Sequence, residues 1–103
     1  MKRGYNMKTV RYQIYQLPRE HPNRFLSYSR AEKRGIRLMD YKEVYRDEIM
    51  DEGEQGTLET LYMKFNVAIP EDYSGHSLSV SDIIYLEGYG AYYCDSIGWK
   101  KVL

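Results

Sequence analysis

The fold is decided by the stretch IIYLEGYGAYYCD, residues 83–95. Apolar and aromatic side chains fill its two arms, and Glu87-Gly88-Tyr89-Gly90 lies between them. Two glycines in this short segment supply the backbone freedom that a tight turn between antiparallel strands requires. We therefore predict a β-hairpin with strands near 83–87 and 91–95.

Two further strands are predicted before this hairpin. Residues 9–16 read TVRYQIYQ, where Val10, Tyr12 and Ile14 alternate with other side chains. Residues 41–46 show a similar β-rich pattern. A period of two is typical of a strand with one buried face, so both segments are expected to join the hairpin in one sheet.

The segment after the second strand predicts the main helix. Thr57 is expected to cap it, and the helix is expected to cover about residues 57–65. Apolar side chains recur there at helical spacing, namely Leu58, Leu61, Tyr62 and Phe65. This stripe is expected to face the sheet.

A shorter helix is expected over residues 24–34, capped by Asn23 and ended by Gly35. The acidic run over residues 47–55 is expected to be a loop. The fold class that follows is α+β: a small antiparallel sheet with one main packed helix and a second short helix.

Length and composition indicate one small domain. Of the 103 residues, 43% are hydrophobic, which is enough for a single core. We predict one domain over residues 1–103, in which residues 1–7 form a basic flexible extension. The chain has 12 Tyr, a residue type that fills cores and is also favoured at protein interfaces.

The sequence also predicts the cellular location of the protein. The N-terminal residues lack the apolar segment of a secretion signal, and no apolar run approaches the roughly 20 residues that span a bilayer. The single cysteine, Cys94, cannot form an internal disulfide. We therefore expect a cytoplasmic protein with no membrane contact.

The net charge of +0 hides a division along the chain. Residues 1–37 hold ten Lys or Arg against two Glu, whereas residues 38–103 hold five Lys or Arg against thirteen acidic residues. Two interpretations stay open: the two portions neutralise each other after folding, or they form separate patches. A neutral total is unlike that of a dedicated nucleic-acid binder, so direct nucleic-acid binding is expected to be weak or absent.

Few residues offer catalytic or metal-binding chemistry. His76 lies in a loop and Cys94 on a strand, so a Cys–His nucleophile is the enzyme alternative. A lone strand Cys is more often a small buried residue, and one Cys with two His is poor material for a metal site. Asp82 is expected to accept backbone N–H groups at the start of the strand at Ile83. We predict no catalytic residue, no metal and no cofactor.

Two motifs resemble a known family. They are GHSLSVSDII at residues 75–84 and YYCDSIGW at residues 92–99. Together with Tyr15-Gln16-Leu17 and Pro70-Glu71-Asp72, they are similar to the YodL-like domains of Firmicutes and of their mobile genetic elements. The resemblance covers most of residues 10–102. It implies a small cytosolic accessory protein, and it carries over no catalytic residue.

A module that binds another protein is the leading functional hypothesis, with a partner whose identity the sequence does not reveal. The candidate binding residues are Tyr89 at the hairpin tip, Trp99 and His76, because a few such side chains often supply most of the binding energy. Whether Trp99 belongs to the core or to an interface stays open. The alternative is a mobile-element-encoded inhibitor of a host DNA-binding or defence protein, acting through the acidic C-terminal two-thirds of the chain.

Overall fold

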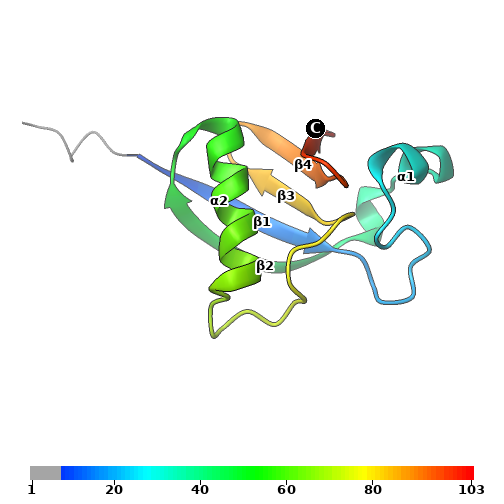
Figure 1. The fold of residues 1–103 in the computed structure, drawn as a ribbon, viewed down its shortest axis with the longest axis horizontal. Coiled ribbons are helices and arrows are strands. Elements are labelled where there is room, and N and C mark those ends of the chain that lie inside the picture. The colour runs from blue at the N-terminus through cyan, green and yellow to red at the C-terminus, as the bar shows by residue number, and fades with distance from the viewer. Residues whose placement is uncertain (1–7) are drawn as a thin grey trace, which may run out of the picture.

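The computed structural model describes residues 8–103 and is built around one antiparallel sheet (Figure 1). In the order β2-β1-β3-β4-β5, its strands are β1 (Thr9–Gln16), β2 (Lys42–Met50), β3 (Ile83–Leu86), β4 (Gly90–Cys94) and β5 (Trp99–Lys101). The connections contain the helices α1 (Tyr28–Arg34) and α2 (Gly53–Val67) and the short 3-10 helix η2 (Leu38–Asp40). The predicted α+β fold class is confirmed. The extension predicted for residues 1–7 lies outside the described residues.

The hairpin predicted from residues 83–95 is present. β3 and β4 pair antiparallel, with Ile84 opposite Tyr92. Gly88 in the turn has a φ of +90°, a conformation that residues with a Cβ rarely adopt. β1 pairs with β3 on one side and with β2 on the other, so β1 is an interior strand, and β3 is the central strand of the five.

The helix α2 covers one face of the sheet (Figure 1). Its buried residues Leu58, Leu61 and Phe65 pack against side chains from the strands, namely Val10, Tyr12, Ile14, Ile84, Leu86 and Tyr92. The predicted stripe is therefore confirmed at three positions, whereas Tyr62 is 39% exposed. Burial of each large apolar side chain contributes about 1.5–3 kcal/mol, so this layer is the main source of stability.

The start of α2 differs from the prediction. The helix begins at Gly53, and Thr57 lies buried within it, where its Oγ1 accepts the Glu52 N–H at 2.9 Å. Asp51 Oδ1 accepts the Gly53 N–H at 2.8 Å. The acidic run over residues 47–55 is not a loop, because its first part continues β2 along β1 and its last part begins α2.

The helix α1 is shorter than predicted. It begins at Tyr28, and residues 21–26 form hydrogen-bonded turns instead. Asn23 is not its cap: the Asn23 Nδ2 donates to the Gly35 carbonyl oxygen at 3.1 Å, and its Oδ1 accepts from Arg34 Nε at 2.9 Å. Asn23 therefore holds the end of the helix. Gly35 ends α1 as predicted, at a φ of +100°.

The second core is smaller and lies on the opposite face. There Ala31 of α1 packs with Ile83, Ala91 and Tyr93 of the sheet. In Figure 1, α1 stands at one end of the molecule and not over the middle of the sheet. None of the described helices is long and apolar enough to cross a membrane.

Candidate functional site

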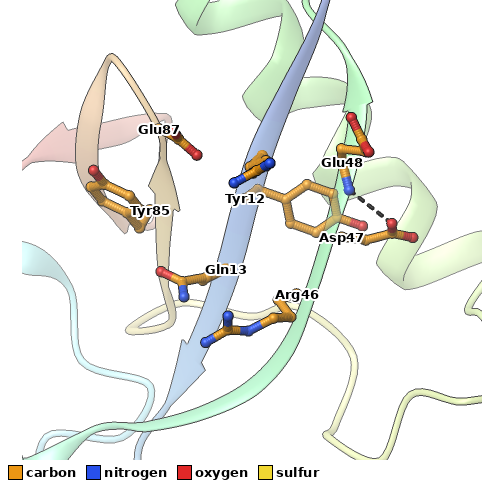
Figure 2. A pocket seen from close by; sticks show the side chains of 8 residues that line it. Tyr12, Gln13, Arg46, Asp47, Glu48, Tyr85 and Glu87 are labelled. Carbon is orange, nitrogen blue, oxygen red and sulfur yellow. Dashed lines mark hydrogen bonds between the residues drawn. The ribbon is translucent and has the colours of Figure 1, made fainter.

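The face of the sheet opposite α2 is open over β1, β2 and β3; we call it the open face. Strand alternation places Arg11 and Gln13 of β1 on this face. The register sets Gln13 between Arg46 of β2 and Tyr85 of β3. Figure 2 shows these three side chains, from three neighbouring strands, around one hollow. Folding leaves them accessible to another molecule.

This hollow is rich in charge. Its volume is about 560 Å³, and its charged lining residues are Arg11, Arg46, Asp47, Glu48 and Glu87. Arg46 is already held by Glu43, because its Nε lies 2.7 Å from Glu43 Oε2. Within residues 8–103, Arg11 and Glu87 form no ion pair. The charges of Arg11 and Glu87 are therefore available to a partner.

An apolar hollow adjoins the charged one. It has a volume of about 360 Å³ and shares Gln13 and Tyr85 with the first; its other lining residues are Tyr15, Leu38, Tyr41, Ile83, Ala91 and Leu103. Tyr15 Oη donates to Gln13 Oε1 at 3.1 Å, and Tyr41 Oη donates to the Ser81 carbonyl oxygen at 2.6 Å. These bonds fix two of the rings, so the hollow is preformed.

Two local features make the edge strand β2 less accessible to a partner strand. The Glu48 N–H donates to Asp47 Oδ1 at 2.8 Å, the dashed line in Figure 2. A bulge also interrupts the β1–β2 register between Ile14 and Tyr15. Both features protect a sheet edge against added strands. Contacts on the open face would therefore come from side chains.

A polar cluster of Gln16, His76 and Asp82 lies where β1 ends and β3 begins. Asp82 is 1% exposed, and its Oδ2 accepts the Ser79 N–H at 2.8 Å and a Gln16 side-chain N–H at 3.1 Å. The bond from Ser79 confirms that Asp82 accepts a backbone N–H just before β3. Burial raises the pKa of Asp82 to about 7, although these bonds and the Arg24 charge act in the opposite direction.

His76 lies against this carboxylate. Its Nε2 is 3.8 Å from Asp82 Oδ1 and makes no hydrogen bond within the described residues. Its Nδ1 is 2.7 Å from the Ser77 carbonyl oxygen. Gln16 Nε2 also lies 3.3 Å from this Nδ1, so Nδ1 has two neighbours within the chain, and Nε2 faces the carboxylate. His76 and Asp82 therefore lie side by side, without a hydrogen bond between Nε2 and Oδ1.

Cys94 is not placed to act as a nucleophile. It is buried, and burial, reinforced by the charges of Asp82 and Asp95, raises the pKa of its thiol to about 12. The Sγ contacts the Asp95 carbonyl oxygen at 3.9 Å and does not bond to His76. Reactive thiols need a lowered pKa. The described part of the chain also contains no group of three or more His, Cys, Asp or Glu that could hold a metal ion.

The predicted binding residues Tyr89 and Trp99 are both partly buried against the α2 core. Tyr89 Oη donates to Asp51 Oδ1 at 2.9 Å, and the Trp99 ring meets Tyr62 edge-on with 6.4 Å between centroids. Asp51 lies beside the start of β1, whereas His76 lies beside its end. The three predicted residues therefore do not share one surface, and their role in binding stays a prediction.

Only an indirect signal for the open face is present in the sequence. Arg11 and Gln13 are the polar half of the β1 alternation, which is the half that a search for core residues sets aside. Tyr85 lies within an otherwise buried strand. The sequence does not reveal that the short helix α1 leaves this half of the sheet uncovered.

Within residues 8–103, one Lys or Arg ion pair, Arg37 with Asp40, joins the basic portion of the chain to the acidic portion. Among residues 8–103, the Lys or Arg ion pairs are Arg37 with Asp40 and Arg46 with Glu43, both local in sequence. The segment around α1 lies at one end of Figure 1, and the junction of β2 and α2 lies at the other. Arg11 of the basic portion, by contrast, lies directly opposite Glu48 of the acidic portion, so the two portions are apart at α1 and adjacent along β1 and β2.

Fold and site together define a class: a small α+β domain whose antiparallel sheet is covered by a long helix on one face and left partly open on the other. Comparison with protein families gives a more specific result, since the YodL-like domain matches residues 11–103. The chain belongs to the family of YodL-like domains. Comparison with curated proteins gave no match, and comparison with solved structures gave none either.

Proposed function

We propose that this protein is a small non-catalytic accessory module that binds another protein through the open face of its sheet. The observation that carries the proposal is the pair of adjoining hollows, one apolar and one charged, that meet at Gln13 and Tyr85. Protein interfaces combine an apolar centre with polar groups that set orientation. The open face offers both on a rigid sheet.

The chemistry of the hollows suits binding better than reaction. An apolar side chain of the partner would enter between Tyr41 and Tyr85, while Arg11 and Glu87 would pair with charges of the partner. The one thiol in the chain, Cys94, is buried with a raised pKa. A surface for recognition is therefore better supported than a catalytic centre.

The inhibitor alternative would rely on the acidic portion of the chain. Two of its carboxylates are already engaged, because Asp51 accepts from Tyr89 Oη and Glu54 accepts from Tyr92 Oη. These bonds reduce the acidic surface that could imitate nucleic acid. The resemblance alone supports a bacterial, mobile-element context and a cytoplasmic location, and we include both in the proposal on that basis.

Affinity purification with two matched baits tests the proposal. Tyr85 on the open face is 36% exposed and Tyr62 on α2 is 39% exposed, so truncating either ring to Ala removes a similar surface. We expect the parent and Tyr62→Ala to retain the same partner from a lysate of a bacterium that encodes the chain. Tyr85→Ala should lose at least about 90% of that partner, a tenfold drop in affinity.

The opposite pattern would contradict the proposal. If Tyr85→Ala retains the partner and Tyr62→Ala loses it, binding occurs on the α2 side, near Trp99. Circular dichroism of both variants must first show that each is folded.

A further inference from the structure

Two tight turns meet beside the buried carboxylate, and each holds a residue with positive φ. The turn from Asn23 to Leu26 closes with a 3.0 Å backbone hydrogen bond and contains Phe25 at φ +70°. The turn from Ser79 to Asp82 closes at 3.1 Å and contains Ser81 at φ +88°. Both residues occupy the third turn position, where Gly is usual when φ is positive. A side chain there costs free energy that Gly would not.

The side chain of Ser81 has a structural explanation. Its Oγ accepts the Phe25 N–H at 3.0 Å, so it ties the two turns together. A Gly at this position would remove that acceptor. The phenyl ring of Phe25 has no comparable explanation, because it is 57% exposed in the folded domain. A bulky apolar side chain is therefore held in an unfavourable backbone conformation and presented to solvent.

The neighbours of Phe25 are groups that carry or accept positive charge. The Arg24 guanidinium lies over the Phe25 ring, with Cζ 4.6 Å from the centroid. The His76 ring lies on its flank, with 6.3 Å between centroids. The surrounding segment 19–37 is basic, holding Arg19, Arg24, Arg30, Lys33, Arg34 and Arg37 against Glu20 and Glu32. The excess of positive charge in this segment favours a partner of negative charge.

We propose that Arg24, Phe25 and His76 form a second docking surface, which binds an acidic segment of a partner protein that carries a bulky apolar side chain. The apolar side chain would pack on the exposed part of the Phe25 ring and beside the His76 ring, and carboxylates next to it would face the Arg24 guanidinium. Stacking of a nucleobase is less suitable, because Arg24 already covers one face of the ring. This surface is distinct from the open face and does not depend on it.

The decisive variant is Phe25→Gly. It removes the ring, and it places at this position the residue that tolerates positive φ. We expect its melting temperature to stay close to that of the parent, because the lost contacts are offset by the relieved backbone. Ile97→Ala is the control, since Ile97 is also apolar and is 90% exposed in another loop.

The probe is the terminally blocked peptide Glu-Asp-Leu-Phe-Asp-Glu, titrated into the 15N-labelled chain and followed by NMR. Amide shifts should concentrate in residues 24–26 and 75–77. Phe25→Gly should weaken binding at least about tenfold, and a peptide with Gln and Asn in place of the acids should lose a similar factor. Ile97→Ala should bind as the parent does.

Five outcomes would overturn the proposal, and the first four concern the docking surface itself. They are no saturable shifts up to about 1 mM peptide, equal binding of the neutral peptide, unchanged binding by Phe25→Gly, and tighter binding of a single-stranded oligonucleotide at the same residues. Shifts centred on Tyr85 would also overturn it, while leaving the proposed function of the open face intact.

Discussion

The two faces of the sheet are built from the same strands, but one is buried under α2 and the other is partly exposed. Along β1, Tyr12 and Ile14 are buried beneath α2, whereas Arg11 and Gln13 project from the open face. We call the face covered by α2 the closed face. Burial of apolar area accounts for the residues on it. Folding does not require the particular mixture of charge and tyrosine on the open face. The comparison indicates that the closed face explains the fold and that the open face is where a binding function is to be sought.

The largest expected effect is on the closed face. The ring of Phe65 is fully buried, with centroids 4.9 Å from Tyr73 and 5.4 Å from Tyr45. Phe65→Ala should lower the free energy of unfolding by about 3–5 kcal/mol, because it leaves a cavity. On the open face, Tyr85→Ala should lower it by about 1 kcal/mol or less. Urea denaturation measures both values, and equal losses would mean that the open face is as structural as the closed one.

The next effect is a pH dependence from Asp82. Its pKa is 3.8 as an ordinary value and about 7 in the folded protein. A raised folded pKa means that the folded state holds the proton more tightly than the unfolded chain. The contribution of Asp82 to stability is therefore complete below about pH 4 and is lost as the pH rises through 7. The loss is on the order of 4 kcal/mol at most.

Asp82→Asn isolates this effect from the other carboxylates. The Asn oxygen still accepts from Ser79 and Gln16, and its N–H can donate to His76 Nε2. The variant should exceed the parent in free energy of unfolding at pH 8 by about 1–3 kcal/mol, and this advantage should vanish by about pH 4. Denaturation of both proteins at several pH values measures the difference. A difference that stays constant from pH 4 to 8 would contradict the raised pKa.

Much of the closed face could be predicted because its signals are local. The alternation of Val10, Tyr12 and Ile14 and the glycine-rich hairpin turn each lie within one short segment. The start of α2 could not be predicted in this way. Thr57 resembles a cap in sequence, but pairing of β2 with β1 extends to Met50 and leaves only Asp51 and Glu52 before the helix.

The polar cluster and the docking surface depend on contacts between distant segments. Gln16 reaches His76 and Asp82 across more than half of the chain. The positive φ of Phe25 results from a turn that is locked to another turn at Ser81. No local pattern reports such contacts, so His76 could be proposed as a candidate from the sequence, but its partners and its neighbour Phe25 could not.

A smaller effect is expected where the closed face reaches the sheet edge. The Trp99 ring is partly buried against the α2 core and Tyr62. Trp99→Ala should lower the free energy of unfolding by about 1–3 kcal/mol, because part of its apolar area is exposed to water. Partner affinity per folded molecule, measured on the same variant by calorimetry, decides whether Trp99 is also an interface residue. Retained affinity assigns the ring to the core alone, and a tenfold loss would extend the binding surface beyond the open face.

The smallest expected effect concerns the charges of the open face. Arg11 and Glu48 are directly opposite in the β1–β2 register, yet they form no ion pair. Replacing either by Ala should change the free energy of unfolding by less than about 0.5 kcal/mol, and a double-mutant cycle should give a coupling of the same small size. A coupling above about 1 kcal/mol would show that folding itself holds these charges together. With little coupling, Arg11 is free to pair with a partner. Arg11→Ala should then weaken partner binding while leaving stability unchanged, which is the reverse of what Phe65→Ala does on the other face.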